Sequence, residues 1–343
     1  MINLKKYSIN ILVIFLVSMF SVNLALQGNF KEIQNMFSNV SLFTFVFLLI
    51  ISFIPHLIEA LILKKFAQLY CSTYRYKDGL INALSGSFLS GITPFASGGQ
   101  FMQAYLFKKQ GIQYADSTGL LLMHFILYQI CLVGYTLLIV LFKYQEFSNY
   151  YNGFLSLALL GFLINSIVII MLLLGALSYK AQYFLTHTIL KIAYKFKLIK
   201  EYDVSKRKLE KYLIDFREGL KTIRKYPLQM FSIILLFFIK LTILYSLPFC
   251  VLFFTQQNMS YQLFFDCFAL CAFVYLITAF VPIPGSSGGT EGTYIILFSV
   301  LVGEVTGRFS MIVWRFITYY FTILIGCIIF MVYINSSKRR GKS

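Results

Sequence analysis

The sequence predicts an all-α polytopic membrane protein. Of its 343 residues, 59% are hydrophobic and only 13% are charged, about half the charged share of a typical soluble domain. The apolar residues form runs that are long enough to cross a bilayer as helices. Two of these runs are interrupted by Pro and Gly at similar motifs. We therefore expect about six to eight transmembrane helices plus two re-entrant broken hairpins related as an inverted repeat, all within one integral membrane domain (residues 1–343).

The first half of this domain is expected to cover residues 8–178. Its apolar runs are Ser8–Leu26, Ser41–Leu63, Leu80–Phe107, Ser117–Phe142 and Gly153–Ser178. The first run follows two lysines and has no convincing small-residue cleavage site after it, so we interpret it as a signal anchor. The run at 80–107 contains a broken motif and is expected to be re-entrant.

A basic stretch at residues 180–226 separates the two halves. It holds 13 Lys or Arg and five acidic residues between Lys180 and Lys225. One interpretation is a solvated cytoplasmic linker, and the other is an amphipathic helix on the anionic inner leaflet. The two interpretations are compatible.

The second half is expected to cover residues 227–334. Its apolar runs are Pro227–Phe254, Leu263–Val281, the short run Tyr294–Val302, and Phe309–Ile334. Nine residues at 1.5 Å each reach about 14 Å, less than half of a hydrocarbon core. Residues 281–302 are therefore predicted to be the second re-entrant segment.

The two broken motifs are Thr93-Pro-Phe-Ala-Ser-Gly-Gly-Gln100 and Val281-Pro-Ile-Pro-Gly-Ser-Ser-Gly-Gly-Thr-Glu-Gly-Thr293. Aligned on Pro94 and Pro284, both continue to Ser-Gly-Gly. Proline removes a backbone donor, and a helix break in hydrocarbon must be buried in protein or line a wet cavity. Broken segments at matching places in two halves indicate a transporter site near the bilayer midplane. The alternative is a pair of Gly-rich turns in ordinary interhelical loops.

The distribution of basic residues predicts the orientation. With both termini in the cytoplasm and the two hairpins entering from opposite sides, 25 of the 30 Lys and Arg fall in cytoplasmic segments and three fall outside. This asymmetry is the positive-inside rule. It accounts for the net charge of +17 without nucleic acid, for which the chain has no motif.

Four charged residues are predicted to lie at membrane depth: Glu59, Lys240, Glu291 and Arg315. Each costs about 2.5–3.5 kcal/mol on insertion scales, so pairing or a wet cavity is expected. Lys240 could pair with Glu59, with Glu291 or with a lipid headgroup. The predicted substrate-binding residues are Pro94, Ser97, Gly98, Gly99, Gln100, Gln103, Lys240, Pro284, Ser287, Gly288, Gly289, Glu291, Arg315 and Tyr319.

The residues of the second motif have a functional and a structural interpretation. The functional one is an anion nest, formed by Ser287, Gly288 and Gly289 before a half-helix, with Arg315 as a bidentate phosphate ligand. Glu291 could instead cap the half-helix, and Trp314 with its neighbouring tyrosines could be interfacial anchors.

His56 and Glu59, three positions apart on one helical face, could form a proton relay or a single interhelical hydrogen bond. His124 lies in an apolar span and is interpreted as a satisfied core residue.

The chain has no catalytic motif such as Gly-x-Ser-x-Gly, a Walker loop or His-Glu-x-x-His. Its six cysteines show neither a paired framework nor metal spacing. We expect no cofactor, no metal and no catalytic residue.

The sequence resembles the transmembrane (flippase) domain of the bacterial lysylphosphatidylglycerol synthase, or multiple peptide resistance factor, family. The resemblance rests on the two broken motifs, on Tyr105-Leu-Phe-Lys-Lys109 and on Trp314-Arg-Phe-Ile-Thr-Tyr-Tyr320. It implies a lipid flippase in the bacterial plasma membrane that moves an anionic or aminoacylated phospholipid, or a glycolipid, and so affects surface charge and cationic peptide resistance. The soluble aminoacyltransferase domain of that family has no counterpart among these residues.

Two alternatives remain open. The chain could be the membrane component of a phosphatidylglycerol lysyltransferase, or a non-transporting docking partner of a separate lipid-modifying enzyme. The residues leave the lipid, the energy source and the oligomeric state open, including a dimer.

Overall fold

The computed structural model describes residues 28–150, 154–195, 199, 201–255, 260–261, 263–279, 281 and 283–340. Regular secondary structure in this part of the chain is entirely helical, which confirms the predicted fold class. The predicted first span, Ser8–Leu26, lies outside the described residues.

The elements up to the basic stretch are α2 (Phe30–Ser38), α3 (Leu42–Ala67), α4 (Tyr76–Gly91), η1 (Pro94–Ala96), α5 (Ser97–Lys109), α6 (Tyr114–Tyr150), α7 (Phe154–Leu177), α8 (Tyr179–Lys195) and α9 (Tyr202–Lys225). Those that follow are α10 (Pro227–Thr255), α11 (Leu263–Thr278), η2 (Pro284–Ser286), α12 (Gly289–Val302), α13 (Glu304–Arg315), η3 (Phe316–Tyr320) and α14 (Phe321–Arg340). The element η3 is a π-helix.

Four helical stretches in the described part of the chain are long and apolar enough to cross a membrane: Leu42–Ala67, Asp116–Lys143, Pro227–Thr255 and Glu304–Ser336. Two shorter apolar stretches, Leu159–Met171 and Leu263–Thr278, accompany them. The last long stretch begins before the predicted start at Phe309, because α13 continues through η3 into α14. The protein is a multi-pass membrane protein.

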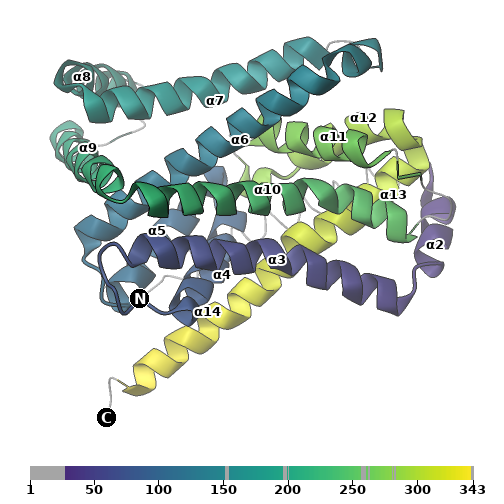
Figure 1. The fold of residues 1–343 in the computed structure, drawn as a ribbon, viewed down its shortest axis with the longest axis horizontal. Helices are drawn as coiled ribbons and strands as arrows, with labels where there is room; N and C mark the ends of the chain where they lie inside the picture. The colour runs from purple at the N-terminus through teal and green to yellow at the C-terminus, as the bar shows by residue number, and fades with distance from the viewer. Residues whose placement is uncertain are drawn as a thin grey trace.

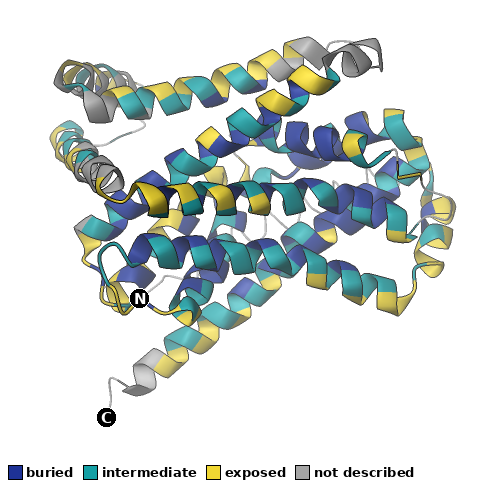
Figure 2. Cartoon of the chain, viewed as in Figure 1, coloured by how far each residue is buried: buried dark blue, intermediate teal, exposed yellow. Residues whose placement is uncertain are grey.

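Helix α10 illustrates a membrane-spanning helix whose exposed face is apolar. Its exposed large side chains, Leu228, Phe231, Leu235 and Ile239, recur at helical spacing, and the opposite positions are buried. A helix that is apolar on its exposed face as well is typical of a membrane span. Figure 2 shows the same pattern along the bundle, with exposed positions on outward faces and buried positions toward the centre.

The helices of the two halves are intermixed in one bundle. Helix α3 packs against α4 and α10, α14 crosses α4, and α10 packs against α11 (Figure 1). The basic stretch forms two helices rather than one, with α8 against α7 and α9 against α6. Its placement on the inner leaflet remains a prediction.

The two broken segments form helical hairpins that approach each other. The α4–η1–α5 hairpin lies toward the end of the bundle that carries α9, and the α11–η2–α12 hairpin lies toward the end that carries α2 (Figure 1). The breaks η1 and η2 are in contact. The relative arrangement thus agrees with two facing hairpins, and their depth in a bilayer remains a prediction.

Candidate functional site

The two breaks share a backbone conformation as well as a sequence motif. The residues before the two prolines, Thr93 and Ile283, are extended, with φ/ψ of −124°/145° and −107°/144°. The residues after the prolines, Phe95 and Gly285, are left-handed, with φ/ψ of 55°/20° and 61°/15°. The match extends the sequence alignment on Pro94 and Pro284 to the geometry of the chain.

The next aligned pair is also left-handed, since φ is 52° at both Ala96 and Ser286. Non-glycine residues in this region store strain that the surrounding structure must hold, and such residues gather at functional sites. The breaks diverge one position later, where Ser97 is helical (ψ −32°) and Ser287 is extended (ψ 144°).

A buried ion pair lies directly beyond the second break. Arg315 donates from Nε to Glu291 Oε1 at 2.8 Å and from Nη2 to the Gly285 carbonyl at 2.6 Å. Ser287 Oγ is 3.4 Å from the same Nη2. Arg315 is 6% exposed and Glu291 is 3% exposed. The predicted charges at membrane depth are therefore paired here, as their cost of burial requires.

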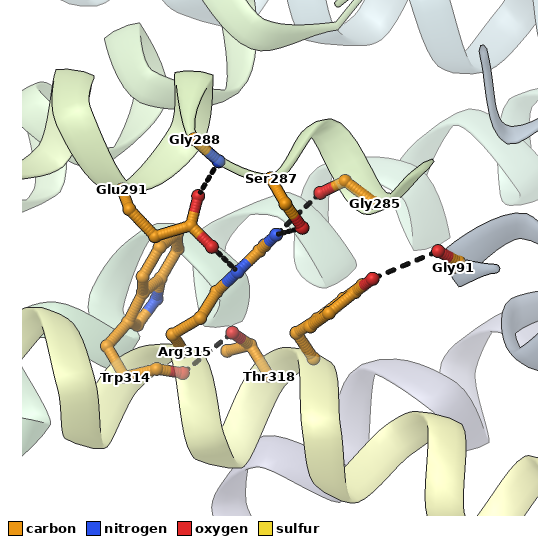
Figure 3. Close-up of polar contacts among 9 residues, drawn as sticks. Gly91, Gly285, Ser287, Gly288, Glu291, Trp314, Arg315 and Thr318 are labelled. Carbon is orange, nitrogen blue, oxygen red and sulfur yellow. Dashed lines mark hydrogen bonds and ion pairs between the residues drawn. The ribbon is translucent and has the colours of Figure 1, made fainter. Parts of the chain in front are cut away.

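Glu291 also occupies the predicted anion nest. Its Oε2 accepts a hydrogen bond of 2.7 Å from the Gly288 backbone N–H, so that one carboxylate joins the start of α12 to Arg315 (Figure 3). This contact is the capping role that was the alternative interpretation of Glu291. The site holds an anion, and the protein supplies that anion itself.

Tyr319 connects this site to the first hairpin. The Arg315 guanidinium carbon lies 4.0 Å from the centre of the Tyr319 ring, a cation–π distance. The Tyr319 hydroxyl donates to the Gly91 carbonyl at 3.0 Å, at the end of α4. A Cβ at Gly285 would overlap the Tyr319 side chain. The close approach therefore requires glycine at position 285.

The π-helix η3 carries this tyrosine. It starts at the residue after Arg315 and ends at the residue after Tyr319. π-Helical turns are rare and are frequent at functional sites. Trp314, which precedes the arginine, is buried and stacks on Tyr294 at 4.8 Å between ring centres, so it is not an interfacial anchor.

The predicted residues of the first hairpin do not all face this junction. Pro94, Ser97 and Gln100 are exposed, and the Ser97 hydroxyl donates to the Pro94 carbonyl. The Gly98 N–H is bonded to Thr93 Oγ1 at 2.8 Å.

Two more of the predicted residues pack inside the hairpin. Gly99 is buried, and the Gln103 side chain packs against Gly86 on the neighbouring helix. The hydrogen bond between the first hairpin and Tyr319 is accepted by a backbone carbonyl, that of Gly91. The predicted residues Pro284 and Gly289 are in the second break, where Pro284 is buried and Gly289 begins α12.

A second charged cluster lies on the long spans. Lys240 Nζ and His124 Nε2 each lie 2.7 Å from the Glu59 carboxylate, on Oε2 and Oε1 respectively. His56 contacts Thr322 at 2.9 Å instead, so the two residues of the predicted relay have different partners. His124 is thus a charged-cluster residue that sequence reasoning assigned to the core. Nothing in its sequence neighbourhood indicates a carboxylate on a helix more than 60 positions away.

The described residues contain no group of three His, Cys, Asp or Glu that could hold a metal ion. Asp266, in the first turn of α11, forms an ion pair of 3.0 Å with Lys143. This pair joins the start of α11 to α6, at the side of the bundle where the charge count places the outside.

Comparison with known proteins identifies the family of this chain. No curated protein and no solved structure is similar enough to this chain to match. The sequence model of the lysylphosphatidylglycerol synthase transmembrane region matches residues 8–326, which include both broken motifs and the Arg315 segment. The chain therefore belongs to the family of lysylphosphatidylglycerol synthase transmembrane regions.

Proposed function

We propose that this protein moves a phospholipid with a charged headgroup between the leaflets of a bacterial plasma membrane. The observation that carries the proposal is the junction of two helix breaks around the buried Arg315–Glu291 pair. Broken helices that meet in a bundle are the usual way in which transporters present charged groups near the bilayer midplane.

The junction offers both signs of charge to a headgroup. Arg315 is suited to a phosphate, since its planar guanidinium can donate two parallel hydrogen bonds. Glu291 is suited to the ammonium group of an aminoacylated lipid. A lipid that carries both groups could separate the pair and replace each internal partner with one of its own.

Glu291 gives the empty site a stable resting state. Without a headgroup, its carboxylate satisfies both Arg315 and the Gly288 N–H. A phosphate competes for the same two donors, so binding would release Glu291 rather than create an unpaired arginine. A ligand shifts a conformational equilibrium only by its difference in affinity for the two conformations. This exchange of partners would let the headgroup favour one arrangement of the two breaks over another.

The test is transbilayer movement of labelled phospholipids in proteoliposomes. We compare phosphatidylglycerol, lysylphosphatidylglycerol and a glycolipid, and expect faster movement of at least one than in empty liposomes. Arg315→Gln should reduce it to the background rate. The matched control is Arg308→Gln, which removes an arginine from an ion pair with the exposed Glu304 on the same helix. Wild-type protein that moves none of the three lipids would refute the proposal.

The orientation and physiological role follow from the same proposal. Both termini would be cytoplasmic, and delivery of aminoacylated lipid to the outer leaflet would lower the negative surface charge and oppose cationic peptides. The competing enzymatic function predicts lysylated lipid when purified protein is mixed with lysyl-tRNA and phosphatidylglycerol. We expect no such product, because the chain carries no recognisable aminoacyltransferase motif.

A further inference from the structure

The cluster around Glu59 takes no part in the headgroup site described above, although it lies on three of the long helices. Glu59 comes from α3, Lys240 from α10 and His124 from α6. Both partners are 2.7 Å from the carboxylate. The His124 contact has ion-pair distance without the alignment of a directed hydrogen bond.

Titratable side chains of α6 and α3 lie next to this cluster. From α6, the Tyr128 ring lies 5.1 Å from Lys240 Nζ. From α3, His56 lies one turn before Glu59 and bonds to Thr322 of α14. The aromatic rings of Phe66 and Phe237 pack edge-on against the His124 imidazole. With a neutral histidine, the carboxylate and the ammonium group cancel.

The histidine is what distinguishes this cluster from a structural ion pair. Glu59 and Lys240 alone would satisfy the need to neutralise two charges in a bilayer. Histidine is the side chain whose charge ordinarily changes between pH 5 and 8, and ionisable residues inside membranes mark proton pathways in pumps and transporters. A proton on His124 would raise the net charge of the three side chains from 0 to +1, and the added charge would lie next to the Glu59 carboxylate.

We propose that His124 is a proton-binding residue through which this protein couples lipid movement to a proton gradient. The inference rests on the proposed function for its coupling step, and on the geometry alone for proton binding. The incoming proton binds the ring nitrogen that carries no hydrogen in the neutral imidazole and forms one N–H bond there. No other bond forms or breaks in this step.

Two of the helices that carry the cluster pack against the two hairpins. Helix α3 packs against α4 of the first hairpin and against η3, which carries Tyr319. Helix α10 packs against α11 of the second hairpin. A protonated His124 competes with Lys240 for the Glu59 carboxylate and so changes the interaction that holds α3 to α10.

Proton binding can be tested without lipid transport. The chain contains only three histidines, so ¹⁵N-histidine NMR of the purified protein should give three imidazole environments. His56→Gln and His187→Gln assign the signal of His124 by elimination. We expect that signal to change as the protein is titrated with acid. A His124 signal that stays constant down to the pH at which the protein unfolds overturns the inference, whether or not lipid moves.

Coupling is tested in proteoliposomes with a pH difference across the membrane. One proton per lipid across one pH unit supports about a tenfold accumulation of lipid in one leaflet. We expect accumulation in the wild type and in His187→Gln, and an equal distribution in His124→Gln. Accumulation that persists in His124→Gln refutes the coupling. If no lipid moves in any sample, the proposed function fails, and the NMR result still decides proton binding.

Discussion

Separate replacement of Arg315 and Glu291 should show that the two residues act as one unit. Arg315→Gln leaves the Glu291 carboxylate buried with the Gly288 N–H as its remaining donor. Glu291→Gln leaves a buried guanidinium that still donates to the Gly285 carbonyl and the Ser287 hydroxyl. The double variant removes both charges and keeps two polar amides of similar size.

The magnitude follows from the burial of both groups. Removal of one member of a buried pair costs about 3–5 kcal/mol, because a charge remains without its partner. Loss of both charges together is often close to neutral. The single changes should therefore sum to well above the cost of the double change, with a coupling energy of about 3 kcal/mol. The pair of Arg308 and the exposed Glu304, whose side chains are 2.6 Å apart, should give a coupling of only about 0.2–1 kcal/mol.

The assay is reversible unfolding in mixed micelles of a mild detergent and dodecyl sulfate, followed by tryptophan fluorescence. Trp314 is the only tryptophan in the chain. It is buried beside Arg315, so its emission reports on this site directly. Additive single changes, or equal couplings for the buried and exposed pairs, would show that Arg315 and Glu291 do not depend on each other as described.

Three further predictions concern the two hairpins. Gly99→Ala should destabilise the fold by about 1–3 kcal/mol because its Cβ would overlap Ser90 Oγ, whereas Gly134→Ala, with open space around it, should stabilise α6 by up to about 1 kcal/mol; the same unfolding assay compares them. Ala96→Gly should stabilise the protein by about 1 kcal/mol by relieving a left-handed conformation, and an unchanged or lower stability would contradict the strain at this break. Tyr319→Phe should cost about 1 kcal/mol through loss of one hydrogen bond and should slow lipid movement in proteoliposomes; an unchanged rate would mean that the link to the first hairpin is structural only.

The positions of the helix breaks could be predicted from the sequence because they depend on local chemistry. Clustered proline and glycine favour a helix break, and Pro94 and Pro284 align two such clusters of similar composition. The single prolines Pro55 and Pro248 instead lie inside the continuous helices α3 and α10. The structure places breaks at both clusters and brings them into contact. The repeated backbone angles show that the alignment captured a real structural equivalence.

The charge pairings could not be predicted in the same way, because they depend on which helices become neighbours. Lys240 had Glu59, Glu291 and a headgroup as candidate partners, and only the packing of α10 against α3 selects Glu59. His56 was the nearer histidine in sequence, but His124 on α6 contacts the carboxylate. Helical periodicity relates positions on one helix and contains no information on the order of helices around a bundle.

The two buried carboxylates have different structural positions, which is the strongest reason to assign them different roles. Glu291 interacts within the second half, between the start of α12 and Arg315. Glu59 interacts between the halves, from α3 to α10. A group that must exchange with a headgroup needs a partner beside the helix breaks, where the backbone already departs from helical geometry. A group that must alter helix packing when a proton binds needs partners on helices from both halves. Among the four charged residues predicted at membrane depth, only Glu59 has such partners, His124 on α6 and Lys240 on α10.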